Sequence, residues 1–270
     1  MNRYDRMFER LEEAGEGAFI PFVTLGDPTP EVSLEVVSCL VEAGADALEL
    51  GIPFSDPIAD GPTIQRATRR ALDAGTTPGT CWELLAEVRK RHPEVPIGLL
   101  VYANLVVQGS VEQFYERAAE AGVDSVLVAD VPTLEAEAFA KVARSKGVCP
   151  VMIATPNASR EKLETVARLG AGYTYVVTRS GVTGAEVDAD TTRSEVLDTL
   201  ARLDAPASVV GFGISRPEQV RAALEAAAAG AISGSAVVRR IEEHRGDREA
   251  MLEALSRFVS EMKAATRPLA

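Results

Sequence analysis

The chain is poor in the residues that most often build metal centres and imidazole-based active sites. Among its 270 residues there are two histidines, His92 and His244, and three cysteines, Cys39, Cys81 and Cys149. The cysteines lie far apart and show no CxxC or comparable ligand spacing. This pattern indicates reduced, buried thiols rather than disulfides, and it argues against a zinc cluster.

Basic charge and long apolar runs are also scarce. The chain has 28 Lys and Arg against 40 Asp and Glu, a formal net charge of −12, and no basic run. Nucleic acid and anionic membranes are therefore poor candidate partners. No apolar stretch reaches the roughly 18 residues of a membrane-spanning helix. Residues 1–17 lack the apolar core of a signal peptide, so we expect a cytoplasmic protein.

What the chain does have is a regular alternation of short apolar runs and longer helical patterns. Hydrophobic residues make up 46% of it, enough to bury a substantial core. Strand-sized, almost wholly apolar runs are typical of parallel strands buried on both faces. Eight such runs are present: Ala18–Leu25, Ala45–Leu50, Pro96–Tyr102, Asp124–Ala129, Pro150–Ala154, Tyr173–Thr178, Ser208–Phe212 and Gly230–Ser233.

Helical patterns separate these runs, and no linker divides the chain. Gly44, Gly122 and Gly170 close three helical segments just before a strand, where glycine suits a left-handed C-cap. Eight strands alternating with helices predict an α/β fold of the (β/α)8 TIM-barrel type, with extra N-terminal and loop helices, as one domain over residues 1–270. The alternative, an open doubly wound sheet, is disfavoured because no GxGxxG follows the first run.

Glu49 is the most conspicuous polar residue within a predicted strand. It lies between Leu48 and Leu50, near the carboxyl end of the second run, so alternation turns it towards the barrel interior. A buried carboxylate costs free energy unless it is paired, hydrogen-bonded or protonated. Glu49 is therefore either a carboxylate satisfied by neighbouring hydroxyl groups or a general acid/base with a raised pKa.

Two further carboxylates follow in the next loop, and each has an ordinary structural interpretation. Asp60 precedes Gly61 and Pro62 and could be a helix N-cap. Asp56 precedes Pro57 and could be a turn residue. Spacing alone does not decide between these roles and a role in chemistry.

Glycine and hydroxyl residues follow the seventh and eighth runs, where barrels often bind phosphate. The segments are residues 211–215, GFGIS, and residues 232–236, ISGSA, each leading into a helix. Such helix starts offer free N–H groups to an anion, unless the glycines serve only tight turns. No lysine is near, so we expect backbone N–H groups and Ser235 to hold a phosphate. The long polar loop 179–186 is a candidate lid or an ordinary surface loop.

Other catalytic groups are badly placed. All of the lysines lie in helical patterns, none of them at a strand end: Lys90, Lys141, Lys146, Lys162 and Lys263. His92 precedes the third run and His244 lies in the C-terminal region. A Schiff base or a histidine-bound metal is thus disfavoured, and carboxylate acid/base chemistry on a phosphorylated substrate remains.

Several segments together resemble one family. Residues 16–28 (EGAFIPFVTLGDP), 49–65 (ELGIPFSDPIADGPTIQ), 179–184 (RSGVTG) and 232–236 (ISGSA) are similar to the tryptophan synthase alpha chain. The resemblance runs from about residue 4 to residue 267. It implies a (β/α)8 barrel that cleaves indole-3-glycerol phosphate to indole and glyceraldehyde 3-phosphate, in a retro-aldol reaction without metal or organic cofactor.

The resemblance also implies roles for individual residues. Glu49 matches the main acid/base, Asp60 the second catalytic carboxylate and Tyr175 a supporting tyrosine. The indole pocket corresponds to Phe22, Leu100, Tyr102, Leu127, Ala129, Ile153, Thr183 and Ile232. The phosphate positions correspond to Gly184, Phe212, Gly213, Gly234 and Ser235.

A protein partner follows from the same resemblance. The family's alpha chain docks on a beta chain in an alpha2-beta2 complex, and the beta chain binds pyridoxal phosphate and receives the indole. The docking surface corresponds to Pro53, Phe54, Asp56, Pro57 and Asn104, so Asp56 is interpreted as an interface residue. A stand-alone lyase that releases free indole and a non-catalytic regulatory subunit are the alternatives.

Overall fold

The computed structural model describes residues 1–177 and 189–268, with the backbone alone for residues 189–194. Within these ranges the strands form one all-parallel sheet in the order β5-β4-β3-β2-β1-β9-β8-β7-β6. The strands are β1 (Ala18–Thr24), β2 (Leu48–Gly51), β3 (Ile97–Val101), β4 (Ser125–Val128), β5 (Cys149–Pro150), β6 (Met152–Ala154), β7 (Thr174–Val177), β8 (Ser208–Gly211) and β9 (Gly230–Ser233).

The sheet closes into a barrel because its two end strands, β5 and β6, are two halves of a single interrupted strand. β5 pairs with β4 and β6 pairs with β7, and Val151 alone separates them. The Val151 N–H donates to the Val126 carbonyl at 3.0 Å, so pairing continues across the break. All eight predicted strands are present and the (β/α)8 prediction is confirmed.

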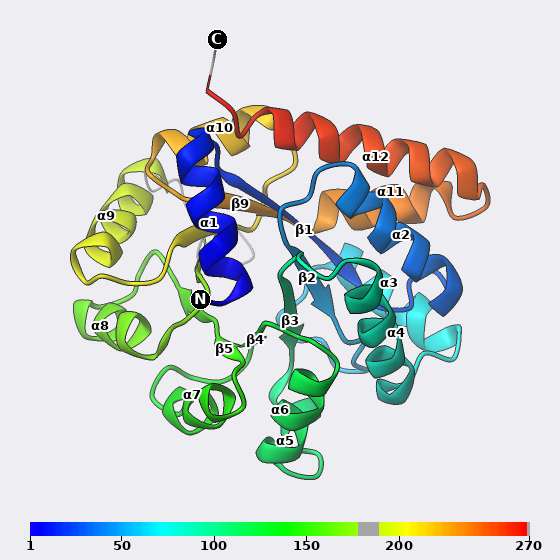
Figure 1. Ribbon diagram of the computed structural model, residues 1–270, viewed down its shortest axis with the longest axis horizontal. Coiled ribbons are helices and arrows are strands. Elements are labelled where there is room, and N and C mark those ends of the chain that lie inside the picture. The colour runs from blue at the N-terminus through cyan, green and yellow to red at the C-terminus, as the bar shows by residue number, and fades with distance from the viewer. Residues whose placement is uncertain (178–188, 269–270) are drawn as a thin grey trace.

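Helices surround the barrel (Figure 1). They are α1 (Arg3–Ala14), α2 (Pro30–Glu42), α3 (Pro62–Asp73), α4 (Pro78–Arg91), α5 (Ala103–Val107), α6 (Val111–Glu120), α7 (Ala136–Ser145), α8 (Arg160–Leu169), α9 (Ala189–Arg202), α10 (Pro217–Glu225), α11 (Ser235–His244) and α12 (Arg248–Ala264). Side-chain caps start many of them; the Thr29, Ser110 and Ser159 hydroxyls each accept an N–H of the first turn.

One helix and one cap differ from the sequence-based prediction. The five-residue helix α5 was not predicted, since it is too short to show a periodicity. Gly44 and Gly122 are left-handed, with φ of 107° and 79°, as predicted. For Gly170 the prediction is wrong: its φ is −68°, and a Cβ there would lie 2.8 Å from the Val166 carbonyl oxygen. Glycine is needed at this position because a side chain would not fit, not because the backbone is left-handed.

The core has two parts, one between the sheet and the helices and one inside the barrel. β1 shows the division, because Phe19 and Val23 face the helices while Ile20 and Phe22 face the interior. Tyr4, Met7 and Leu11 of α1 also belong to the inner part. Helix α1 therefore covers one end of the barrel, and in Figure 1 it lies across the strands.

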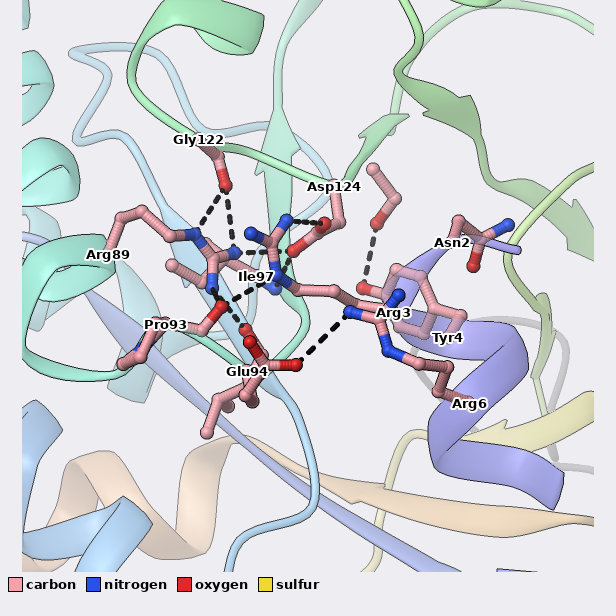
Figure 2. Close-up of polar contacts among 12 residues, drawn as sticks. Asn2, Arg3, Tyr4, Arg6, Arg89, Pro93, Glu94, Ile97, Gly122 and Asp124 are labelled. Atoms are coloured by element: carbon pink, nitrogen blue, oxygen red, sulfur yellow. Dashed lines mark hydrogen bonds and ion pairs between the residues drawn. The ribbon is translucent and has the colours of Figure 1, made fainter. Parts of the chain in front are cut away.

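That end is the amino end, and buried ion pairs fasten it. Figure 2 shows Asp124, just before β4, accepting hydrogen bonds from Arg3 of α1 (2.9 Å) and Arg89 of α4 (2.5 Å). Asp124 also accepts the Ile97 N–H at 2.8 Å, and the Tyr4 hydroxyl lies 2.9 Å from the Ser125 hydroxyl. With the amino end closed, the carboxyl end is left open for a ligand.

Candidate active site

A cavity of about 500 Å³ opens at the carboxyl end of the strands. Its wall contains most of the residues proposed from the sequence. They are Phe22, Glu49, Asp60, Leu100, Leu127, Ala129, Ile153, Tyr175, Phe212, Gly213, Ile232, Gly234 and Ser235. The wall is mainly apolar, with carboxylates near β2 and glycine turns near β8 and β9. Such a cavity suits a ligand with a flat apolar part and a small polar part.

Glu49 lies inside the barrel, as its place in β2 predicts, and is 2% exposed. Its Oε1 accepts a hydrogen bond from the Tyr173 hydroxyl at 2.7 Å. Within the part of the chain that the structure describes, Oε2 has no partner, which leaves it available to a ligand in the cavity. Burial raises the pKa of Glu49 to about 7, and the Tyr173 hydrogen bond opposes this shift. Near neutral pH the group can therefore both give and take a proton.

Asp60 lies on the loop between β2 and α3, and it is not a helix cap. The N-cap of α3 is Gly61, which makes no side-chain cap bond, so the structural alternative for Asp60 is wrong. Tyr102 supports the loop by accepting the Ala59 N–H at 3.1 Å. Burial raises the pKa of Asp60, and the Tyr102 hydroxyl opposes that shift. Tyr102 itself is not part of the cavity wall; it lies behind the Asp60 loop.

Two glycines make room for the aromatic rings of the wall. A Cβ on Gly211 would lie 2.3 Å from the Tyr175 hydroxyl oxygen, so the end of β8 accommodates the tyrosine only without a side chain. A Cβ on Gly51 would lie 2.9 Å from Cζ of Phe22, and one on Gly234 would lie 3.5 Å from Cδ1 of the same ring. The Phe22 ring therefore stands between β2, which carries Glu49, and the glycine turn after β9.

The two glycine turns differ in what they offer to an anion. At α11 the N-cap is Gly234, and the N–H groups of Ser235 and Ala236 have no acceptor within the helix. At α10 the helix begins with Pro217, and the Gln219 side chain accepts the N–H groups of Ser215 and Arg216 at 2.9 and 3.1 Å. Just before α10, two N–H groups are thus already engaged, and Pro217 has none to offer. On that side the turn itself is accessible, since a Cβ on Gly213 would meet nothing within 4 Å.

The sequence missed two residues of this region. Tyr173, the hydrogen-bond donor to Glu49, lies two residues before Tyr175, and alternation along the strand was the signal that both face inwards. Arg239 lines the cavity, although no cation was expected there. Its signal was the spacing of four from Ser235, which places both on one helix face. Thr183, Gly184 and the rest of loop 179–186 lie outside the described residues.

The proposed docking residues lie away from the cavity wall, on the loops after β2 and β3. Asp56 and Asn104 are exposed, Phe54 and Pro57 are partly exposed, and Pro53 is buried. The Phe54 ring stacks on Tyr102 with centroids 5.4 Å apart, and the Ser55 hydroxyl donates to Asp56 at 2.5 Å. The side chain of Ile58, on the same loop, is 80% exposed.

The cysteines are unpaired; Cys81 and Cys149 are buried as predicted, whereas Cys39 is only partly buried. Across residues 1–177 and 189–268, no group of three or more His, Cys, Asp or Glu side chains is arranged to hold a metal ion. In the same ranges no helix is long and apolar enough to cross a membrane.

Comparison with known proteins gives one consistent result. The family model for the tryptophan synthase alpha chain matches residues 8–267. A tryptophan synthase alpha chain of Aliivibrio fischeri is 57% identical over 267 residues, which cover 99% of this chain and 100% of the relative. One of Photobacterium profundum is 56% identical, with 99% of each chain covered.

Solved structures agree in fold. The tryptophan synthase alpha subunit of Legionella pneumophila superposes with a TM-score of 0.88 at 32% identity, covering 98% of both chains. A chain of the tryptophan synthase a2b2 complex of Pyrococcus furiosus gives a TM-score of 0.83 at 38% identity, covering 92% of this chain and 98% of that one.

Proposed function

The chain belongs to the tryptophan synthase alpha chain family, and from that premise we propose that it cleaves indole-3-glycerol phosphate to indole and glyceraldehyde 3-phosphate. The observation that carries the proposal is Glu49, a buried carboxylate with a pKa of about 7 in the wall of an apolar cavity that Asp60 also lines. The reaction is a carbon–carbon lyase reaction of the retro-aldol type.

Glu49 would act as the acid/base. Its proton goes to C3 of the indole ring, which becomes an iminium-like electron sink. The bond between C3 and the glycerol chain then breaks, and its electrons return to the ring. The adjacent glycerol hydroxyl loses its proton to Glu49 and becomes the aldehyde. The Glu49 carboxyl group thereby regains the proton that it donated to C3. A pKa near 7 suits both halves of this cycle.

Asp60 and Tyr175 would complete the reacting centre. Asp60, on the loop, accepts the indole N–H and stabilises the positive charge that develops on the ring. Tyr175 would support the ring from β7. Phe22, Leu100, Leu127, Ala129, Ile153 and Ile232 form the apolar wall for indole, with Tyr102 behind it and Thr183 on the loop after β7.

The phosphate would lie at the glycine turns. Ser235 contributes its hydroxyl and N–H, Gly234 and Gly213 allow the backbone close to the anion, and Phe212 and Gly184 complete the set. Helix α11 adds the favourable field of its N-terminus. In this arrangement the phosphate anchors the substrate while the indole ring reaches Glu49.

A beta chain is the proposed partner, in an alpha2-beta2 complex that passes indole from one chain to the other. The related Pyrococcus furiosus protein is described as an a2b2 complex. Pro53, Phe54, Asp56, Pro57 and Asn104 would form the contact, together with the exposed Ile58. We expect pyridoxal phosphate on the beta chain and no organic cofactor on this one.

Indole release by the purified chain, measured with and without a beta chain, tests the proposal. We expect slow cleavage alone and clear stimulation by the partner. Strong turnover without stimulation would favour a stand-alone lyase that releases free indole. Stimulation of the partner without any cleavage would favour a regulatory subunit.

A further inference from the structure

The cavity wall carries charge of opposite sign on two sides. The acidic and basic side chains of its wall, among the residues that the structure describes, are Glu49, Asp60 and Arg239. The two carboxylates come from β2 and the loop after it, whereas Arg239 comes from α11, after β9. β1 lies between β2 and β9 in the sheet, and its Phe22 ring stands between the two sides. A ligand that carries an anion at one end would be oriented by this asymmetry.

Arg239 faces the cavity because of its place on α11. It follows Ser235 by four residues, so both lie on one face of the helix. Ser235, Ala236 and Arg239 all line the cavity, which places that face against the ligand space. Arg239 is exposed, and its guanidinium can therefore reach an anion held at the start of the helix.

Two neighbouring charged side chains of α11, Arg240 and Glu242, are engaged elsewhere. Arg240 lies 3.7 Å from the centroid of the Phe258 ring and donates to the Ala236 carbonyl at 2.6 Å. Glu242 pairs with Arg66 and Arg70 at 2.7 and 3.0 Å. Arg239 has no hydrogen bond or ion pair with any side chain that the structure describes. Its donors are therefore not consumed within the described protein.

A cation at this position would offset the repulsion between an acidic protein and an anionic ligand. The chain has a net charge of −12, and a phosphate monoester carries about two negative charges at pH 7. Two carboxylates line the same cavity. A guanidinium offers a fixed fork of donors that matches phosphate oxygens, and it stays charged at any physiological pH.

We propose that Arg239 is a specificity-determining residue that selects a dianionic phosphate end of the substrate. The inference rests on the proposed function and adds a side-chain cation to a phosphate site otherwise made of backbone N–H groups and Ser235. Arg239 lies on the side of the cavity away from the Glu49 carboxylate. It therefore acts on substrate affinity and leaves the proton transfers unchanged.

Arg239→Gln, Arg239→Lys and a matched control test this role. The control is Arg257→Gln on α12, which changes the net charge equally at an exposed pair with Glu253. We expect Arg239→Gln to raise KM for indole-3-glycerol phosphate and Kd for glycerol 3-phosphate about tenfold. Its kcat and its Kd for neutral indole stay within about twofold of wild type. Arg239→Lys is intermediate and Arg257→Gln is unchanged.

Calorimetry of glycerol 3-phosphate needs no turnover, so it separates this inference from the proposed function. If the wild type releases no indole but its Kd for glycerol 3-phosphate depends on Arg239, the proposed function fails and the anion role stands. If the wild type releases indole while Arg239→Gln keeps both constants, the role of Arg239 is overturned. It is also overturned if Arg257→Gln shifts them equally, because the effect is then one of bulk charge.

Discussion

The two ends of the barrel use buried carboxylates in opposite ways. At the amino end, Asp46 and Asp124 stand in two related segments, AGADALEL (43–50) and AGVDSVLV (121–128). Each accepts a backbone N–H from the neighbouring strand, that of Phe19 at 2.9 Å or Ile97 at 2.8 Å. At the carboxyl end, Glu49 and Asp60 have no ion-pair partner among the side chains that the structure describes.

Cations account for the difference. Asp46 pairs with Lys263 at 2.9 Å and with Arg10 at 3.2 Å, and Asp124 pairs with Arg3 and Arg89. Glu49 of β2 lies only three residues after Asp46, which precedes that strand, yet a tyrosine hydroxyl is its one hydrogen-bond partner in the described chain. Paired carboxylates fasten strands and helices together, whereas an unpaired one is kept partly protonated by burial.

The comparison shows at which end of the barrel the protein loses stability in exchange for catalytic chemistry. A cation beside Glu49 would stabilise its ionised form and lower its pKa, which would remove the proton that the reaction needs. The protein therefore carries an unfavourable carboxylate at the open end and a well-satisfied network at the closed end. Substitutions at the two ends should accordingly separate activity from stability.

The largest expected effect is on activity at the carboxyl end. Glu49→Gln keeps the shape of the side chain but removes the proton that it gives and takes, so indole release should fall about 10³-fold or more. Substrate binding, measured by calorimetry, should stay near wild type. Glu164→Gln, in an exposed pair with Arg160, is the control. A Glu49→Gln enzyme with near-wild-type turnover would refute the acid/base role.

At the amino end the expected loss is one of stability. Asp124→Ala leaves Arg3 and Arg89 without their shared carboxylate and the Ile97 N–H without its acceptor, which should lower the free energy of unfolding by about 3–5 kcal/mol. Urea denaturation measures this loss. The matched control, Glu116→Ala, breaks an exposed pair with Lys146 and should change stability by about 0.5 kcal/mol or less. Equal midpoints for the two variants would show that the amino-end network does not fasten the barrel.

Glu49 should also make stability depend on pH. Its folded pKa of about 7 lies above the ordinary value of 4.5. Between these values the unfolded chain releases a proton that the native protein keeps, so wild type loses stability as the pH rises from 4.5 to 7. Glu49→Gln escapes this loss and should gain about 3 kcal/mol relative to wild type at pH 8, and far less at pH 5. Urea midpoints that differ equally at both pH values would contradict the raised pKa.

Much of the fold could be predicted from the sequence because buried parallel strands are apolar on both faces. All eight runs are strands, since nothing else in the chain combines their length with their composition. The break at Val151 and the short helix α5 could not be predicted, because neither changes the apolar pattern. Gly170 was misjudged because the tight approach of the Val166 carbonyl oxygen is a tertiary contact.

A site residue could be predicted where its chemical type differs from that of its neighbours in the sequence. Glu49 is visible as a charge within an apolar strand, whereas Tyr173 and Arg239 are ordinary residues until the fold brings them to the cavity. The two glycine turns look alike in sequence, but Gln219 occupies the N–H groups at the start of α10. Alternation and the spacing of four place Tyr173 and Arg239 on one face of their elements, but only the fold shows that these faces meet Glu49 and the cavity.

The smallest expected effect concerns Tyr173, which contacts residues from both ends of the barrel. Tyr173 donates to Glu49 and its ring lies 5.5 Å from that of Tyr4, which contacts Ser125 near the amino end. Because the Tyr173 hydrogen bond lowers the pKa of Glu49, Tyr173→Phe should raise that pKa by roughly one unit, or about 1.4 kcal/mol. If Glu49 must be protonated to act, activity falls as the pH rises through its pKa. The pKa of the alkaline limb of the kcat/KM profile should then rise by the same amount in Tyr173→Phe. Tyr4→Phe should keep the wild-type profile, because Tyr4 makes no hydrogen bond to Glu49. Overlaying profiles for all three proteins would show that the hydroxyl of Tyr173 does not tune the carboxylate.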